Sequence, residues 1–148
     1  MPIKSFRGLI ADNSIDTITL HTNTGSTGYR IKKFQIMLEQ MGAADCEHVV
    51  QIYSVPQTTV ANPLKNDFQD NTLLGVAMQS AASDARFYPE DHNVIFDNIV
   101  FNQDIYVVHN DNQGSASCNY YIELEQVKLD LNENTVATLK DIRNIASQ

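Results

Sequence analysis

Short segments in which apolar and polar residues alternate are the feature that most limits how this chain can fold. In residues 15–20, Ile18 and Leu20 fall on one face and two threonines fall on the other. Successive side chains of a β-strand point to opposite faces, so this alternation is typical of a strand with one covered face. Further segments of strand-like composition are residues 29–38, 48–53, 105–109 and 119–131. Polar turns separate these segments, which predicts an all-β sandwich or barrel.

Two of the predicted strands change phase midway. The apolar pattern shifts across Lys32 and Lys33 in one strand and across Glu125 and Gln126 in the other. One extra residue turns the side chains that follow it onto the other face, and a β-bulge is the local structure that does this. Because a bulge also bends its strand, we expect a jelly-roll-like antiparallel β-sandwich that wraps around its core.

The chain has the length of a single domain. At 148 residues it buries roughly two-thirds of its unfolded surface, which suffices for one core but not for two. We therefore predict one β-sandwich domain spanning residues 1–148.

The middle of the chain, residues 58–91, departs from the alternating pattern. It contains two prolines and many Asn and Asp residues, and its one regular stretch, residues 73–82, has a helix-like composition. We expect a long loop excursion that includes either one short helix or an irregular strand. Long loops on small β-domains often carry binding sites.

The C-terminal segment, residues 134–146, repeats apolar residues at intervals of three. This spacing predicts a short C-terminal helix of about three turns. Its apolar side chains are our candidate interface with another subunit, and the alternative is that they cover the end of the chain's own sandwich. They are Val136, Leu139, Ile142 and Ile145.

Charge and hydropathy exclude two classes of partner. The net charge is −8 and the pI is about 4.7, so we expect no direct binding to the phosphate backbone of a nucleic acid. No run approaches the roughly 20 apolar residues of a membrane-spanning helix. The first residues lack the apolar block of a signal peptide. We therefore expect a protein that is made in a cytoplasm-like compartment and either stays there or is released by lysis.

Cys46 and Cys118 are the only cysteines. Their wide separation leaves open one disulfide or two buried thiols, and we favour the thiols.

The four histidines, the acidic residues and the serines show none of the spacings typical of metal ligands or catalytic groups. No two histidines share an HxH or HxxxH spacing, and residues 45–48 cannot all converge on one ion because alternate side chains face opposite ways. Residues 24–28 lack the ending of a phosphate loop, and turn chemistry explains residues 110–114 without calcium. Glu123 and Glu125 lie on the outward face of a predicted strand. We predict no catalytic residue, no metal and no cofactor.

Tyr120 and Tyr121 begin a predicted strand with one ring inward and one outward. An outward tyrosine can stack on a sugar, so a carbohydrate-binding module is an alternative to an assembly protein. Cross-strand packing is the simpler explanation of these rings.

Several stretches in order along nearly the whole chain resemble small virion-associated proteins of marine tailed bacteriophages. They are residues 6–8, 23–31, 47–53, 94–98, 101–106, 119–124 and 136–144. None of them is a chemical signature, and the predicted excursion, residues 58–91, contains none of them.

This resemblance implies a structural role in the virion. We expect a capsid decoration or cement subunit that is synthesised in the host cytoplasm and binds the major capsid (coat) protein lattice at the capsid surface. It would act as a homo-oligomer, with a trimer suiting the local symmetry of an icosahedral head. A tail or neck component is a second structural possibility, and the alternative from another class is a carbohydrate-binding module of a host-recognition tail fibre.

Overall fold

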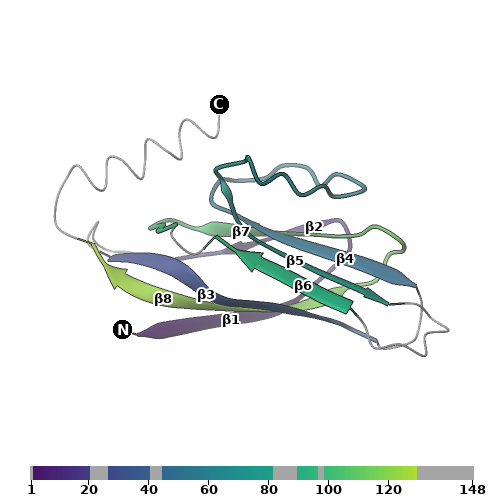
Figure 1. The fold of residues 1–148 in the computed structure, drawn as a ribbon, viewed down its shortest axis with the longest axis horizontal. Helices are drawn as coiled ribbons and strands as arrows, with labels where there is room; N and C mark the ends of the chain where they lie inside the picture. Colours follow the sequence, from purple (N-terminus) through teal and green to yellow (C-terminus); the bar gives the residue numbers. More distant parts are fainter. Residues whose placement is uncertain (1, 21–26, 41–44, 82–89, 97–98, 130–148) are drawn as a thin grey trace.

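A computed structural model describes residues 2–20, 27–40, 45–81, 90–96 and 99–129. In these residues the protein is all-β, and two antiparallel sheets pack face to face as a sandwich (Figure 1), which confirms the predicted fold class. The strands are β1 (Ile3–Ile10), β2 (Ser14–Ile18), β3 (Thr27–Leu38), β4 (Cys46–Tyr53), β5 (Leu73–Ala81), β6 (Glu90–Ile95), β7 (Ile105–Asp111) and β8 (Cys118–Lys128).

The strand order is jelly-roll-like. The smaller sheet has the order β1-β8-β3, and the larger has the order β2-β7-β4-β5-β6. Strands from the two ends of the chain therefore pair in a nested way, β1 with β8, β2 with β7 and β4 with β5. A jelly roll nests its strands in this manner. Here β6 pairs with β5 in the larger sheet, so the two sheets contain three and five strands.

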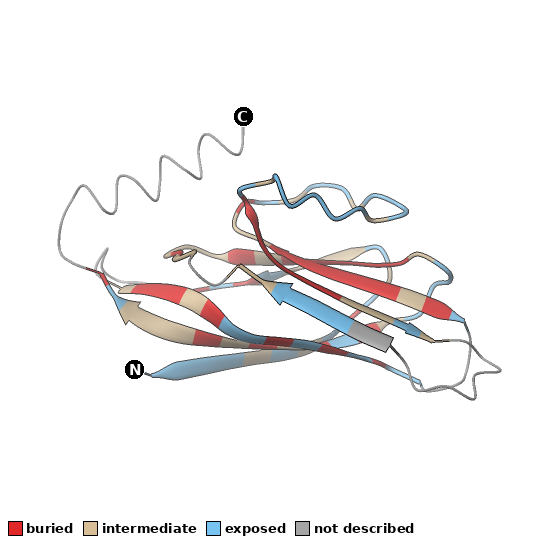
Figure 2. Ribbon diagram, viewed as in Figure 1, coloured by how far each residue is buried: buried red, intermediate tan, exposed pale blue. Residues whose placement is uncertain are grey.

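The core lies between the sheets and is made of alternate residues of the inner strands. Val50 and Ile52 of β4 face Ile122 and Leu124 of β8 across this layer, and all four are fully buried. Burying each such side chain contributes roughly 1.5–3 kcal/mol. Figure 2 shows the burial concentrated in β4, β5 and β7, whereas β1 and much of β6 are exposed.

One of the two predicted bulges is confirmed. In β3 the register with β8 shifts between Ile31 and Lys33, so the extra residue is Lys32. The bulge takes up this residue and keeps Ile31 and Phe34 both buried in the core.

The second predicted bulge, at Glu125 and Gln126, is wrong. Both residues stay in regular register with β3, opposite Arg30 and Tyr29. The apolar phase changes close to the end of β8 at Lys128, and the next residue, Leu129, is buried.

The predicted excursion over residues 58–91 is corrected in its second half. The helix-like residues form β5, which pairs on both sides, with β4 and with β6. Its small residue Gly75 lets the ring of Phe34 approach, because a Cβ added there would lie 3.4 Å from that ring. Sheet pairing and burial thus override the helical preference of the Leu, Ala, Met and Gln residues in this segment.

The first half of the excursion is a loop between β4 and β5, as expected, and it covers the outer face of β4. The Gln51 side chain donates hydrogen bonds to the Lys65 carbonyl at 2.8 Å and to the Asn66 side chain at 2.7 Å. Gln51 is therefore buried although it points away from the core. The predicted C-terminal helix lies outside the described residues.

Candidate functional site

The outer face of the smaller sheet carries exposed apolar side chains. Ile3, Leu9 and Met37 are 51%, 52% and 64% exposed, whereas Ile10, next to Leu9, and Ile36 and Leu38, on either side of Met37, are buried. Leu9 and Met37 flank Asn119 on one rung that crosses β1, β8 and β3. We call the outward-facing residues of these three strands the outer sheet face.

A groove of about 690 Å³ crosses the outer sheet face over three successive rungs. Its outward-facing lining combines one cation, two amides, one phenol and two apolar side chains. These are Arg7, Gln35, Asn119, Tyr121, Leu9 and Met37. Such a mixed lining suits a protein segment or a sugar better than a purely apolar ligand.

Charged residues occupy the far end of the same face. The Arg30 guanidinium lies 3.0 Å and the Lys32 ammonium 3.3 Å from the carboxylate of Glu125. Hydrogen bonds from Arg30 and Lys32 lower the pKa of Glu125. Exposed pairs of this kind contribute little stability, but they fix the charge pattern beside the groove.

Tyr120 and Tyr121 face opposite sides, as the alternation predicted. Tyr120 is buried and donates a hydrogen bond to Asp16 of the other sheet at 3.2 Å. Tyr121 lines the groove, and its hydroxyl donates to Glu123 at 2.8 Å. The Lys33 ammonium lies 5.9 Å from the Tyr121 ring centre, within the range of a cation–π contact.

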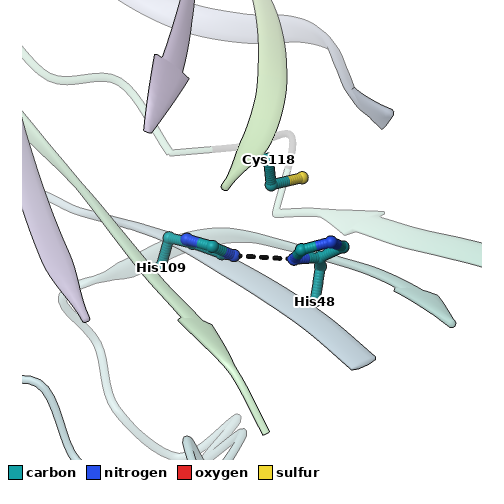
Figure 3. Close-up of side chains that lie close together, drawn as sticks. All are labelled: His48, His109 and Cys118. Carbon is teal, nitrogen blue, oxygen red and sulfur yellow. Dashed lines mark hydrogen bonds between the residues drawn. The ribbon is translucent and has the colours of Figure 1, made fainter. Parts of the chain in front are cut away.

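A second group of chemically active side chains lies inside the sandwich at one end. His48 of β4, His109 of β7 and Cys118 of β8 converge, and all three are buried (Figure 3). Each offers one metal-ligating atom, and these atoms lie within 4.8 Å of one another. We call these three residues the interior His/Cys cluster.

Hydrogen bonds fix the orientation of the two histidine rings. His48 Nδ1 lies 2.9 Å from His109 Nε2, and His109 Nδ1 lies 2.9 Å from the Ala11 carbonyl oxygen. A carbonyl only accepts, so His109 carries its proton on Nδ1 and its Nε2 accepts from His48. His48 Nε2 is then a lone pair, and it has no hydrogen-bond partner among the described residues.

The turn between β1 and β2 brings the Ala11 carbonyl to this point. Asn13 adopts a left-handed backbone conformation, with φ of 56°, which asparagine tolerates better than most residues. The next residue, Ser14, donates its hydroxyl to the Asp12 carbonyl at 3.2 Å. The Asp12 side chain in turn accepts the backbone N–H of Asp111 at 2.7 Å.

Burial keeps the cluster neutral. It lowers the pKa of both His48 and His109, and at His48 the neighbouring His109 adds to the effect. Burial likewise raises the pKa of the Cys118 thiol to about 12. Both rings are therefore uncharged at neutral pH; the His109 lone pair accepts from His48, and the His48 Nε2 lone pair has no partner among the described residues.

Asp111 closes the loop beside the cluster. Its carboxylate accepts backbone N–H groups of Glu47, Gln113, Gly114 and Ala116 at 2.9–3.1 Å. Burial alone would raise the pKa of Asp111, but these donors and the nearby His48 outweigh it and lower the pKa. Asp111, the last residue of β7, thus stabilises the turn that follows the strand.

The sequence missed the interior His/Cys cluster. The alternation argument holds within residues 45–48, but it leaves Cys46 and His48 on one face. That face meets His109 because β4 and β7 pair with Val50 opposite His109. The sequence offered one signal for this cluster: each of two segments with the composition of a buried strand, residues 48–53 and 105–109, contains a histidine.

Two further predictions concern the cysteines and the C-terminal interface residues. Cys46 and Cys118 are both free and buried, which confirms two buried thiols. The candidate interface residues lie outside the described residues, so their contacts stay a prediction. They are Val136, Leu139, Ile142 and Ile145.

Neither a protein-family model nor a curated protein gives a significant match to this sequence. The part of the chain that the structure describes has no helix with the length and apolar character required to cross a membrane.

Proposed function

We propose that this chain is a structural subunit of a bacteriophage virion, a capsid decoration or cement protein that binds the coat lattice at the capsid surface. The order of familiar stretches along the sequence supports the virion assignment. The outer sheet face supports an assembly role, and it is the observation on which the proposal depends.

Ile3, Leu9 and Met37 are large apolar residues that are exposed, and all three lie on the side of the smaller sheet that faces away from the core. Leu9 and Met37 share one rung, whereas Ile3 lies six residues from Leu9 along β1, beside Glu125. Exposed apolar side chains set among polar groups on one face are typical of an interaction surface. Covering each half-exposed side chain would contribute about 1 kcal/mol.

Repetition makes contacts of this size sufficient. A cyclic homo-oligomer, a trimer on a local threefold axis, would present the outer sheet face three times to the coat lattice. Linked weak contacts then act at high effective concentration, so the assembly binds much more tightly than one subunit.

Co-sedimentation with assembled heads tests the surface. The double variant Leu9→Ser/Met37→Ser should lose at least tenfold in binding, because two apolar contacts on the groove are removed. Val94→Ser is the matched control, since Val94 is 41% exposed on β6 of the other sheet. Full co-sedimentation of the double variant would show that the lattice does not use this face.

The oligomeric state and the C-terminal segment need separate measurements. Light scattering after gel filtration should give the mass of a trimer, and deletion of residues 134–148 tests the interface predicted at Val136, Leu139, Ile142 and Ile145. A protein that stays monomeric at high concentration and does not bind heads contradicts the proposal.

The groove supports one alternative function, a carbohydrate-binding module of a host-recognition fibre. Tyr121, Asn119, Gln35 and Arg7 supply an aromatic ring and hydrogen-bonding groups in one depression, as a sugar site requires. Glycan-array binding that Tyr121→Ala abolishes would favour this alternative. Binding to heads that survives Tyr121→Ala would favour decoration.

A further inference from the structure

We propose that His48, His109 and Cys118 form an interior site for a divalent transition metal of the zinc class, which clamps the two sheets together. The proposal is independent of the assembly role, because the cluster lies inside the sandwich and shares no residue with the outer sheet face.

The donor set and its spacing fit such an ion. Two imidazole nitrogens and one thiolate sulfur prefer zinc and similar metals over calcium or magnesium, which prefer oxygen. Tetrahedral zinc with bonds of 2.0–2.3 Å places its donors about 3.3–3.8 Å apart. The three donors already lie within 4.8 Å of one another, so side-chain shifts of about 1 Å would close the site.

The surroundings of the two rings resemble those of metal ligands. Metal-binding histidines usually give their second N–H to a carbonyl or carboxylate, which fixes the tautomer, and His109 does so at Ala11. His48 Nε2 is buried and unpartnered among the described residues. A hydrogen-bonded histidine pair alone leaves that lone pair unsatisfied, at a cost of desolvation that a bound metal would offset.

The electrostatic field also favours a cation. The carboxylates of Asp12 and Asp111 interact electrostatically with both His48 and His109. Both carboxylates are held in place by backbone N–H groups, Asp12 by that of Asp111. Their negative charges would stabilise the positive charge that remains on a divalent metal bound to two neutral rings and one thiolate.

Proton balance is simple. Coordination replaces the S–H bond of Cys118 with a metal–sulfur bond and releases that proton to solvent. Where the metal displaces the hydrogen bond between the rings, the His48 ring keeps one proton, on the nitrogen that is not a ligand. No electron is transferred.

The consequence is a cross-link between layers. His48 and His109 belong to the five-stranded sheet, whereas Cys118 begins the central strand of the three-stranded sheet. An ion bound to all three therefore resists separation of the sheets at this end, and it stabilises the folded state as any ligand specific to that state does.

Cobalt(II) binding to the full-length, chelator-treated and reduced protein tests the site. We expect one Co²⁺ per chain, with tetrahedral visible bands and a thiolate-to-cobalt charge-transfer band in the near ultraviolet. Cys118→Ser should abolish the charge-transfer band. Cys46→Ser, which removes the other buried thiol, and His92→Ala, which removes a histidine outside the cluster, should both retain it.

Thermal unfolding gives an independent readout. Zinc at about 100 times its dissociation constant should raise the unfolding midpoint of the wild-type protein by about 5–10 °C. Cys118→Ser should lose this increase, with circular dichroism confirming its fold.

Either of two results overturns the proposal. One is a wild-type protein with neither a cobalt–thiolate band nor a zinc-dependent rise in the midpoint. The other is a band that survives Cys118→Ser or disappears in Cys46→Ser, since either assigns the sulfur ligand elsewhere.

Discussion

Tyr120 joins the two sheets through a single side chain. Its ring packs over Gly8 of the neighbouring strand, and its hydroxyl donates to Asp16 of the opposite sheet at 3.2 Å. Burial, aided by the charge of Asp16, raises the pKa of Tyr120 to about 12. Folding therefore favours the neutral phenol.

This pKa predicts a loss of stability in alkali. The contribution is complete below the unfolded pKa of about 10 and is lost as the pH rises toward 12. Between pH 9 and 11 wild-type protein should lose on the order of 1 kcal/mol more than Tyr120→Phe in urea unfolding. Tyr106→Phe is the matched control, which should lose as much as wild type. Equal losses in wild type and Tyr120→Phe would contradict the prediction.

Gly8 is required for space. A Cβ at this position would lie 2.9 Å from the Tyr120 hydroxyl oxygen and 3.0 Å from two ring carbons. Gly8→Ala should therefore destabilise the protein by about 1–3 kcal/mol in chemical unfolding, because a buried ring must move. Ser5→Ala, on the exposed face of the same strand, should change the free energy of unfolding by less than about 0.5 kcal/mol. A neutral Gly8→Ala would show that the ring has room to shift.

Single residues were predictable where their chemistry is local. The facing of Tyr120 and Tyr121 and the turn role of Asp111 follow from alternation and side-chain type. The interior His/Cys cluster was not predictable, since it depends on which strands pair. His48 and His109 meet through a β4–β7 register that no spacing in the sequence encodes.

Among the elements, the β3 bulge bends its strand without changing the face to which the apolar side chains point. Lys32 is the unpaired residue, and without it Ile31, Lys33 and Phe34 would alternate regularly against β8. The bulge thus adds a bend while every apolar residue of β3 keeps its side.

Two single-residue deletions in β3 should differ sharply. Deleting Lys32 removes the bend but preserves facing, and should cost about 1 kcal/mol. Deleting Gln35 turns Ile36 and Leu38 outward, and should cost about 3–6 kcal/mol at 1.5–3 kcal/mol for each residue. Denaturant midpoints of the two variants measure the difference. Similar losses would mean that the bend itself holds the sandwich together.

Alternation or strand-like composition predicted β2, β3, β4, β7 and β8, but not β1, β5 or β6. The Leu, Ala, Met and Gln residues of β5 favour a helix in isolation. β5 becomes a strand because β4 and β6 pair on both of its edges and the core requires small residues opposite Phe34. Local composition contains neither fact.

For the whole molecule, the reactivity of the two buried thiols measures unfolding of the sandwich. Cys46 and Cys118 are 6% and 0% exposed, and burial raises the pKa of both. In chelator-treated native protein we expect less than about one-tenth of the thiols to react promptly with a water-soluble disulfide reagent. Both should react in denaturant. Prompt reaction of one thiol in the native protein would reveal local opening at that end of the sandwich.

The fold class of the whole molecule was predictable from the sequence, but the pairing of its strands was not. Alternation and one bulge suffice for a wrapped antiparallel sandwich, because each strand must cover one apolar face. The pairing of β1 with β8 and of β2 with β7 joins segments that are far apart in the sequence, and alternation within each segment does not specify it.

The nested pairing also sets the order of events during synthesis. Every residue of β1 pairs with a residue of β8, and even the closest pair, Ile10 and Cys118, is 108 residues apart. At 5–20 residues per second, a ribosome needs about 5–22 s to make the intervening chain. Until β8 has been made, β1 and β3 lack the strand that lies between them, so the smaller sheet, with the face proposed to bind the coat, can form only after residues 118–128 have left the ribosome.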